Sequence, residues 1–492
     1  MLKSDAEYNK GTGEEAVGKL ERFFSLIDSS RIFDSIDLHY FTTLRNEIQD
    51  SLVQLLVWKR SFLESEKSLN WPYEALKERV SFFENLAQKK SSPMFRHQAR
   101  LFLALLPFPG QWGWLTKFEK EFKNDAEIDE FLKMEKQKIQ AKLRGKRQKQ
   151  YKLRHFCQIL KKPRLPREKG VLRIFSLPYL FIDPTLLKVL NHQYFLYVEP
   201  TAGAIFRHTW WRNFSTLEDP FLFGVSSEED AMFLQSQSGT LTTNLAHGDF
   251  MENEVAVDLG KEKHFDIVFN STFDEMPRKR HNLLLSLLHH PLLRHATALV
   301  IGRGKEKNVN NFKQKIDQNG LSHRVTVMSN LRRIDVSKQL AHCRMGVHFS
   351  LHENGCRCIY EFFRSDLPCV ISSSTAGVNM EIFNSMTGLA VPDKDLPDAI
   401  SYVLLNKKKF TPRRWFLANS GSYHSTFKLN EQLKAIFQNR GYEWSDDIIP
   451  LGSSGANRYL HDSHYTKFRY EFGKLLESFR KLPNFPIKLS LD

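Results

Sequence analysis

The spacing of apolar residues changes along the chain and divides it into two kinds of region. Residues 1–150 carry apolar side chains every three or four positions, which is the period of an amphipathic helix. Two such runs are Val17, Leu20, Phe24 and Ile27, and, after a helix-start signal at Pro72, Leu76, Val80, Phe83 and Leu86. The pattern predicts an all-helical N-terminal extension over residues 1–150.

From about residue 171, short apolar runs alternate with a helical pattern. The runs 171–177, 194–198 and 221–225 predict buried strands, and residues 228–235 predict a helix. The loop between the second and third runs contains His208 and the pair Trp210 and Trp211, which suit either an acceptor groove or plain packing. We expect a first α/β lobe over residues 151–262. Because this lobe is small, we expect a C-terminal helix at 463–481, within the segment 455–492, to complete it.

The alternation continues over residues 263–454. Strands are predicted at 265–269, 298–301 and 325–328, and helices at 281–289, 310–319 and 336–342. Strands that alternate with helices favour a parallel, doubly wound sheet, so we expect a second α/β lobe here.

The stretch 350–368, SLHENGCRCIYEFFRSDLP, contains two carboxylates with seven residues between them. Glu353 lies in a polar loop that also holds Gly355, whereas Glu361 lies in an apolar run typical of a helix. The runs 345–351 and 367–373 on either side are typical of buried parallel strands. Open α/β sheets bind ligands at such loop-to-helix junctions, and the amides of a helix start favour anions. The stretch therefore predicts a site for polar hydroxyls beside a phosphate.

Composition narrows the class of protein. A chain of 492 residues is too long for one ordinary core, and an apolar fraction of 41% is enough to fill two or three. The N-terminus is polar, and no apolar run approaches the roughly 18 residues of a membrane-spanning helix. We expect a soluble, cytoplasmic protein.

The net charge of +15 is concentrated in one segment. Residues 133–169 contain fifteen Lys or Arg against two acids, Glu135 and Glu168. Three interpretations remain open: a solvated basic helix that runs into the Pro-containing linker 161–170, a surface for an anionic membrane, and a nucleic-acid surface. Nucleic acid is the least favoured, because aromatic residues are sparse there and no recognised binding motif accompanies the charge.

Four of the five cysteines fall in one region, at Cys343, Cys356, Cys358 and Cys369. Structural zinc sites commonly use paired C-x-x-C spacings, which this chain lacks. We therefore expect buried, reduced thiols and no metal ligands.

Several segments occur in a recognisable order: FDIVFNSTFDEMPRKRHNLLLSLL, ALVIGRG, GLSHRVTVM, the spaced carboxylates, DLPCVISSSTAGVNMEIFNSMTGLAVP and DLPDAISYVLLN. In this order, residues 265–405 resemble the donor-binding half of the family 4 retaining glycosyltransferases. The resemblance implies two Rossmann-like lobes of the GT-B type, here with an added helical extension. It also implies metal-independent transfer of a hexose, with retention, from a nucleoside-diphosphate sugar to a hydroxyl of a glycan or lipid-linked glycan, as in polysaccharide biosynthesis. The donor would be a substrate, and no further cofactor is implied.

The resemblance assigns roles to individual residues. Glu361 would hold the ribose hydroxyls of the nucleotide, and Glu353 would face the donor sugar. Lys279 falls where the family has a lysine for the diphosphate. Where the family has a partnering arginine after the first strand of this lobe, the chain has Asn270 and Ser271. The candidate replacements are Arg278, Arg280 and Arg303.

Further donors and a first-lobe residue complete the implied site. His208 stands where the family often has a histidine against the donor sugar, and the amides near Gly355 and Cys356 suit phosphate oxygens. A diphosphate leaving group needs its growing charge stabilised, and each charge-assisted hydrogen bond contributes about 1.5–3 kcal/mol. No Asp-x-Asp stands where a metal would be needed in this lobe, so we expect catalysis without a divalent ion.

Structural roles compete with these assignments. Glu361 suits a salt bridge within its helix, Glu353 a solvated loop, and Lys279 a generic basic surface. At the level of the whole chain, the alternatives are a catalytically inactive GT-B protein that acts as a binding or scaffold module, and an inverting enzyme or phosphorylase on the same fold. The phosphorylase is disfavoured because the sequence context of its cofactor lysine is absent.

Overall fold

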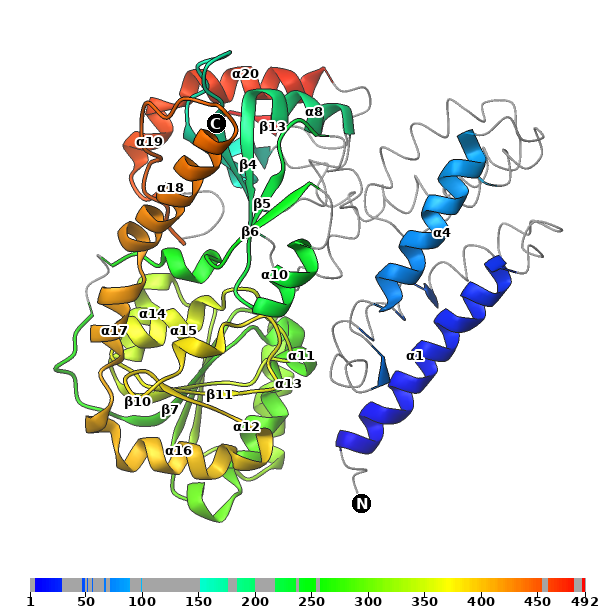
Figure 1. The fold of residues 1–492 in the computed structure, drawn as a ribbon. Coiled ribbons are helices and arrows are strands. Elements are labelled where there is room, and N and C mark those ends of the chain that lie inside the picture. The colour runs from blue at the N-terminus through cyan, green and yellow to red at the C-terminus, as the bar shows by residue number, and fades with distance from the viewer. Residues whose placement is uncertain are drawn as a thin grey trace.

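The computed structural model describes residues 5–28, 71–88, 151–175, 184–199, 217–235, 239–253, 257–453, 459–481 and 489–491, with a few single positions between 47 and 99. Figure 1 shows two α/β lobes, one above the other, joined by segments that run between them. Within the described residues, no helix is both long enough and apolar enough to span a membrane.

Two helices are described in the N-terminal extension, α1 (Asp5–Asp28) and α4 (Trp71–Gln88). They pack through the edge-to-face rings of Phe24 and Trp71, whose centroids lie 5.9 Å apart. Arg79 Nη2 also lies 2.6 Å from Asp28 Oδ2. The two helical runs predicted from the sequence are confirmed, and the remainder of residues 1–150 lies outside the described residues.

The first lobe contains a five-stranded sheet in the order β2-β3-β4-β5-β6. Its strands are β2 (Cys157–Lys161), β3 (Gly170–Ile174), β4 (Tyr194–Val198), β5 (Phe221–Gly224) and β6 (Thr240–Thr243). Three short helices accompany them: α8 (Pro184–Gln193), α10 (Glu228–Gln235) and the 3-10 turn η5 (His247–Phe250). All pairings are parallel except β2 with β3. The predicted strands near 171, 194 and 221 and the helix 228–235 are confirmed, whereas β2 and β6 were not predicted.

The prediction of a basic helix fails for the described part of residues 133–169. Here the chain forms β1 (Tyr151–Lys152), the 3-10 turn η3 (Leu153–His155) and β2. The reason lies in burial, because every residue of β2 is buried in the sheet. Lys161 Nζ lies 2.6 Å from Glu168 Oε1, and buried Lys169 contacts both Asp219 and Glu218. These two cations are neutralised inside the lobe, and residues 133–150 lie outside the described residues.

The C-terminal part of the chain returns to the first lobe. It contains α18 (Ser422–Asn439), α19 (Asp462–Lys467), α20 (Arg469–Arg480) and β13 (Leu489–Ser490), which pairs with β1. The buried side of α18 joins the hydrophobic core of the first lobe through Leu429, Leu433 and Phe437. The expected division at residue 454 assigns this helix to the second lobe, but its apolar face packs in the first.

The second lobe is a six-stranded, fully parallel sheet in the order β12-β11-β10-β7-β8-β9. Its strands are β7 (Phe265–Asn270), β8 (Ala298–Gly302), β9 (Val325–Ser329), β10 (Cys343–His348), β11 (Cys369–Ser372) and β12 (Gly388–Val391). Its α-helices are α11 (Met276–Lys279), α12 (His281–Leu288), α13 (Glu306–Gln318), α14 (Arg333–Leu340), α15 (Arg357–Arg364), α16 (Leu396–Leu405) and α17 (Pro412–Asn419). Five 3-10 turns connect them: η6 (Phe273–Glu275), η7 (Pro291–Leu293), η8 (Met380–Ile382), η9 (Asp393–Asp395) and η10 (Lys407–Lys409).

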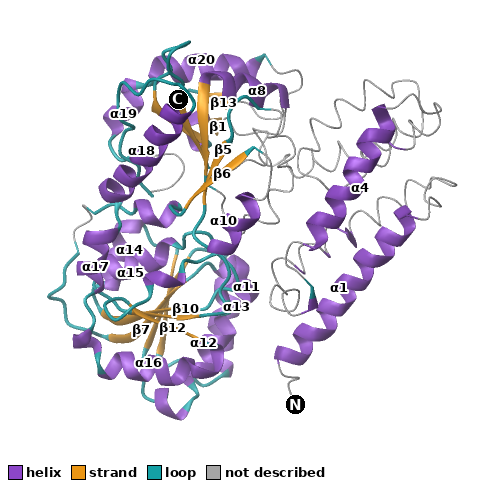
Figure 2. Cartoon of the chain, in the orientation of Figure 1, coloured by secondary structure: helices purple, strands orange, loops and turns teal. Residues whose placement is uncertain are grey.

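Helices cover both faces of this second sheet, as Figure 2 shows. Successive residues of a strand point to opposite faces, so Ile267 and Phe269 enter one core and Val268 enters the other. The doubly wound arrangement predicted from the sequence is confirmed. The two sheets are consistent with the paired Rossmann-like lobes of the GT-B type.

Truncation of a buried ring on α18 tests how this helix packs. Phe437 is fully buried, and its ring lies 5.7 Å from that of Phe195 and 4.9 Å from that of Trp444, measured between centroids. We expect Phe437→Ala to lower the free energy of unfolding by about 3–5 kcal/mol, because it leaves a cavity in the core. Denaturant unfolding followed by tryptophan fluorescence measures the change. Phe427→Ala on the same helix is the control, since that ring is 65% exposed. Equal losses in the two variants would contradict the packing of α18 described above.

Candidate active site

The carboxyl ends of β7 and β10 define the candidate site. These strands are neighbours, yet the chain leaves β7 toward β8 on one side and reaches β10 only after β9. Such a reversal in strand order leaves a crevice outside the carboxyl ends of the strands, where open α/β sheets bind ligands. A cavity of about 710 Å³ opens at this point.

The lining of the cavity comes from both lobes. The first lobe contributes Phe175, Glu199 and His247. The second lobe contributes six residues predicted from the sequence: Lys279, Arg303, Glu353, Gly355, Cys356 and Glu361. It also contributes Asn270, Ser271, Arg278, Arg333, Asn354, Arg357 and Cys358. Six of the eight site residues predicted from the sequence are therefore collected in one cavity.

Glu353 is held at the floor of the cavity by a cluster of cations. Its carboxylate accepts a hydrogen bond from Lys279 Nζ, and its Oε1 lies 3.5 Å from both Arg278 Nη1 and His348 Nε2. Burial is the largest single effect and favours the neutral acid, but Lys279, His348 and Arg278 together outweigh it and hold the pKa of Glu353 well below its usual range. The carboxylate is therefore ionised at neutral pH.

The loop that carries Glu353 is positioned by close backbone contacts. The Glu353 amide donates to the Ala376 carbonyl at 2.8 Å, which ties this loop to the segment after β11. Gly377 has a φ of +75°, and a Cβ there would lie 1.9 Å from the Glu353 carbonyl oxygen. Only glycine fits such a position. The loop after β11 therefore supports the carboxylate through its backbone.

Lys279 reaches the carboxylate because a short helix ends abruptly. Helix α11 stops at this lysine, and Arg280 takes a left-handed conformation with a φ of 57°. The turn aims the Lys279 side chain at the cavity and the Arg280 side chain away from it, toward Asp393, where Nη1 lies 3.1 Å from Oδ1. Arg280 does not line the cavity. Its guanidinium serves an ion pair, and we assign it no contact with a ligand.

Glu361 lies one turn into α15 and is also buried. Asn270 Nδ2 donates to one carboxylate oxygen at 3.1 Å, and Arg357 Nε lies 3.2 Å from the other. Asn270 occupies the position where the sequence resemblance led us to look for an arginine. Its amide orients the Glu361 carboxylate within the cavity.

Two further predicted residues, Arg303 and Gly355, lie on the rim of the cavity. Arg303 follows β8, and its exposed side chain lines the cavity while its backbone carbonyl accepts from Thr272 Oγ1 at 2.9 Å. Gly355 has a φ of +59°, and a Cβ there would lie 2.4 Å from Ala246 Cβ of the first lobe. The lobes are thus in direct contact at this glycine. His208, the remaining predicted residue, lies outside the described residues.

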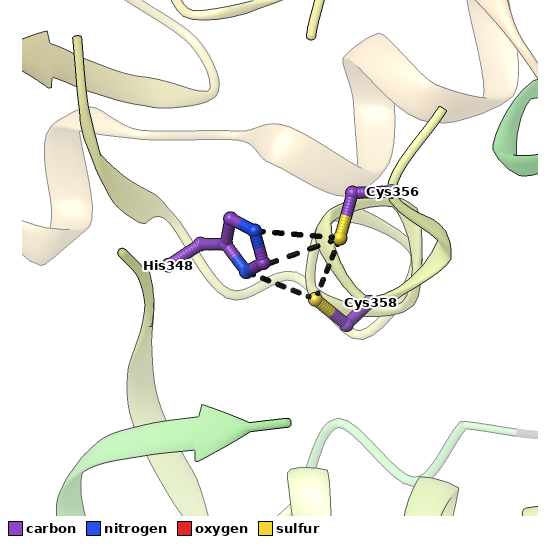
Figure 3. A group of neighbouring side chains, drawn as sticks. All are labelled: His348, Cys356 and Cys358. Carbon is purple, nitrogen blue, oxygen red and sulfur yellow. Dashed lines mark hydrogen bonds between the residues drawn. The ribbon is translucent and has the colours of Figure 1, made fainter. Parts of the chain in front are cut away.

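Cys356 and Cys358, at the start of α15, lie beside His348, the last residue of β10 (Figure 3). The two sulfurs are 3.2 Å apart, and His348 Nδ1 lies 3.5 Å from Cys358 Sγ. A hydrogen bond from Cys358, opposed by burial and assisted by His348, lowers the pKa of Cys356 well below that of an ordinary thiol. Burial is the largest single effect and would lower the pKa of His348, but Cys356 and Glu353 together outweigh it and raise the pKa to about 9.

The first lobe contributes a histidine that sequence reasoning missed. Arg173 grips Glu199 through two hydrogen bonds of 2.8 Å, and Glu199 Oε2 lies 3.2 Å from His247 Nδ1. Burial is the largest single effect and raises the pKa of Glu199, but Arg173 and His247 together outweigh it and the pKa falls below its usual range. This buried carboxylate fixes the His247 ring at the cavity wall. His247 follows β6, and because β6 was not predicted, the sequence offered no strand end to draw attention to it.

A hydrogen bond between the lobes lies next to His247. Tyr360 Oη on α15 donates to Asp249 Oδ1 at 2.8 Å. Burial raises the pKa of Asp249 to about 6, against the effect of this hydrogen bond, which favours the ionised form. Asn354 adds a second link, because its Oδ1 accepts from the Ser226 amide at 3.2 Å.

Solved structures match the chain at low sequence identity. A point mutant of Staphylococcus aureus TarM, solved with fondaparinux, alpha-GlcNAc-glycerol and UDP, has a TM-score of 0.42 and 15% identity, with 53% of this chain and 54% of that chain covered. Sucrose-phosphate synthase from Thermosynechococcus elongatus has a TM-score of 0.45 and 13% identity, with 54% and 73% covered. Anabaena HepE in complex with UDP-glucose has a TM-score of 0.41 and 14% identity, with 54% and 78% covered. The chain thus spans about half the length of TarM.

No curated protein matches the chain in sequence. The family model described as Glycosyl transferases group 1 matches residues 264–406. This range begins at β7, ends just after α16, and includes both carboxylates of the cavity. Residues 264–406 therefore form a domain of the Glycosyl transferases group 1 family, the family 4 glycosyltransferases.

Proposed function

We propose that this chain is a retaining glycosyltransferase that moves a hexose from a nucleoside-diphosphate sugar to a hydroxyl of a glycan or lipid-linked glycan. One observation carries the proposal. A single cavity between the lobes gathers two buried carboxylates and a cluster of cations at the reversal point of the second sheet. Carboxylates suit the hydroxyls of ribose and sugar, and cations suit a diphosphate.

The cations of the cavity provide for the leaving group. Lys279 has three N–H donors, so it can keep its contact with Glu353 and still donate to a phosphate oxygen. Arg278 and Arg303 line the same cavity and add charge at its wall and rim. Charges that are already in place when the diphosphate departs stabilise the transition state without rearrangement. We propose that these protein cations, with no divalent ion, neutralise the leaving group.

The two carboxylates bind different parts of the donor. Glu361 is oriented by Asn270 and Arg357 and presents a fork of two acceptor oxygens, which matches two vicinal ribose hydroxyls. Glu353 sits closer to the cations and faces the donor sugar. The departing phosphate, held by Lys279, takes the proton of the acceptor hydroxyl on the same face of the sugar. His208 stays a predicted sugar contact from the first lobe.

UDP is the nucleotide to test first, since solved structures of TarM and HepE contain it. The sugar and the acceptor follow from assays of transfer or donor hydrolysis across common nucleotide sugars. The anomeric configuration of the product, determined by NMR, tests retention.

A second candidate is a catalytically inactive GT-B protein that acts as a binding or scaffold module. The observation that favours it is Asn270, which replaces a phosphate-binding arginine with a neutral amide already bonded to Glu361. Calorimetry with a panel of nucleotides and nucleotide sugars separates the two candidates. An enzyme binds at least one nucleotide sugar, whereas no binding to any member of the panel favours the scaffold.

Glu361→Gln tests the ribose assignment. The substitution keeps the shape and the partner Asn270 but removes the charge of the acceptor. A charged hydrogen bond contributes about 1.5–3 kcal/mol, so we expect UDP to bind about 10–150-fold more weakly. Isothermal titration calorimetry measures the affinity. Glu306→Gln, at the exposed start of α13, is the matched control and should bind UDP as the wild type does. A Glu361→Gln protein with full affinity for UDP would refute the ribose role.

Glu353→Gln tests the carboxylate that faces the sugar. We expect turnover to fall by about 100-fold or more, because an electrostatic contact aligned with the reacting centre is lost. Affinity for UDP should change much less, since the nucleotide does not touch this residue in our proposal. Steady-state rates and calorimetry on the same preparation measure the two effects. If turnover survives at the wild-type level in a folded variant, Glu353 has no part in the chemistry.

Association with an anionic membrane remains a prediction for residues 133–169. Because the described Lys161 and Lys169 are paired inside the first lobe, the remaining cations of the segment would make the contact. Cosedimentation with vesicles that contain anionic lipid should show binding at low salt that weakens at high salt, with zwitterionic vesicles as the control. Failure to sediment at either salt concentration removes the membrane from the proposal.

A further inference from the structure

One cluster of side chains beside the cavity has no role in the proposed transfer. His348 ends β10, and Cys356 and Cys358 follow eight and ten residues later, at the N-cap and in the first turn of α15. The loop between these elements folds back, so the three side chains converge, as Figure 3 shows. Among the described residues, their ligand atoms all lie within 4.8 Å of one another.

The distances suit a tetrahedral metal ion. Zinc binds thiolate sulfur at about 2.3 Å and imidazole nitrogen at about 2.0–2.1 Å, which places two sulfurs about 3.8 Å apart and a sulfur and a nitrogen about 3.5 Å apart. His348 Nδ1 lies 3.5 Å from Cys358 Sγ, and Cys356 Sγ lies 3.9 Å from Nδ1 and 3.7 Å from Nε2. The two sulfurs are 3.2 Å apart and need to separate by a few tenths of an ångström.

The surroundings of the cluster resemble those of a supported metal site. If Nδ1 of His348 faces the ion, its other ring nitrogen, Nε2, faces Glu353 Oε1 at 3.5 Å. A carboxylate on the far nitrogen of a metal-binding histidine fixes the ring and strengthens the ligand. The imidazole is 1% exposed, so this ligand is shielded from bulk water.

The cluster also has an entry path. Both Cys356 and Cys358 line the cavity, whereas His348 does not. An ion can therefore reach the two sulfurs through the cavity. Ligand identity, spacing, second-sphere support and access are the features by which a metal site is recognised.

We propose that Cys356 Sγ, Cys358 Sγ and His348 Nδ1 bind one Zn²⁺ ion, with the fourth position open to the cavity. Each thiol that is protonated in the free protein releases its proton to solvent when the ion binds. The ion connects the end of β10 to the start of α15 and so anchors the loop between them, which carries Glu353. This departs from the sequence-based expectation of plain buried thiols. Binding of the ion does not depend on glycosyl transfer.

The sequence signal for this site was incomplete. A C-x-C spacing is shorter than the pairs of common structural zinc sites, and the histidine lies upstream instead of downstream. The third ligand becomes visible only because the carboxyl end of β10 lies beside the start of α15. The proposal thus stands on tertiary geometry.

Cobalt substitution of the full-length, tag-free chain is the direct test. The protein is reduced, stripped with a chelator and titrated with Co²⁺, which gives a thiolate-to-cobalt charge-transfer band when cysteine binds it. We expect the band to saturate at one ion per chain and to disappear when Zn²⁺ is added. Competition with a chromophoric chelator then gives the Zn²⁺ affinity. Absence of the band in the reduced wild-type protein overturns the proposal, whatever the activity of the protein.

Variants locate the site. We expect Cys356→Ser, Cys358→Ser and His348→Ala each to weaken Zn²⁺ binding by more than about 100-fold, which exceeds the 10–100-fold loss typical of second-sphere changes. Cys343→Ser is the matched control, since Cys343 is a buried cysteine on β10 outside the cluster and should leave the affinity unchanged. A charge-transfer band that persists in the Cys356→Ser/Cys358→Ser double variant assigns the ion elsewhere and refutes the proposal.

Two further readouts do not depend on binding affinity. Zn²⁺ should raise the melting temperature of the wild type and of Cys343→Ser but not of the cluster variants, because an ion that binds only the folded state stabilises it. Mass spectrometry of the protein before reduction shows whether Cys356 and Cys358 instead form a disulfide. A disulfide that persists under the reducing conditions of the cobalt titration would contradict a metal site.

Discussion

The buried contact between Glu353 and Lys279 is the interaction on which the candidate site depends. A carboxylate removed from water is costly unless it is paired and hydrogen-bonded, so its neighbours have little freedom. The left-handed turn at Arg280 aims the lysine, and the glycine at position 377 lets the loop after β11 approach the backbone of Glu353. The shape of the cavity floor therefore follows from the need to keep one negative charge satisfied.

The cavity lies between the two lobes, and residues that follow strands of both sheets line it. Hydrogen bonds from Tyr360 to Asp249 and from the Ser226 amide to Asn354 join the lobes at the rim. Helix α18 adds a covalent constraint, because the chain leaves the second lobe and buries the apolar face of this helix in the first. The relation between the lobes is thus maintained by polar contacts near the site and by apolar packing away from it.

The distribution of charge gives the second lobe its chemical character. Arg278 and Lys279 surround Glu353, whereas Arg280 is drawn away by Asp393 although it is adjacent in sequence. Lys279 and Arg280 are adjacent in sequence, but the turn between them directs their side chains to different partners. In the first lobe, Lys161 and Lys169 are likewise absorbed by internal acids, so a count of basic residues overstates the charge available to a partner.

Local pattern was sufficient for much of this architecture. The period of apolar residues predicted α1, α4 and most strands and helices of the second lobe, because a segment buried on one face must repeat with its own geometry. The spacing of Glu353 and Glu361 within a strand, loop and helix likewise indicated a ligand site, and Lys279 followed from the ordered resemblance. Where burial was decided by distant neighbours, the pattern failed: β2 carries basic and polar residues yet lies inside a sheet, and β6 is short and rich in threonine.

What only the tertiary structure decided concerns side chains brought together from separate elements. His247 is held at the cavity wall by Glu199, which Arg173 binds in turn. His348 contacts two cysteines because the loop between them folds back. Only the tertiary structure shows that Arg280 points toward Asp393 and that Asn270 donates a hydrogen bond to Glu361. The physical reason is that a sequence determines the period and polarity of each element, whereas the contacts between elements depend on how the sheets close around a shared core.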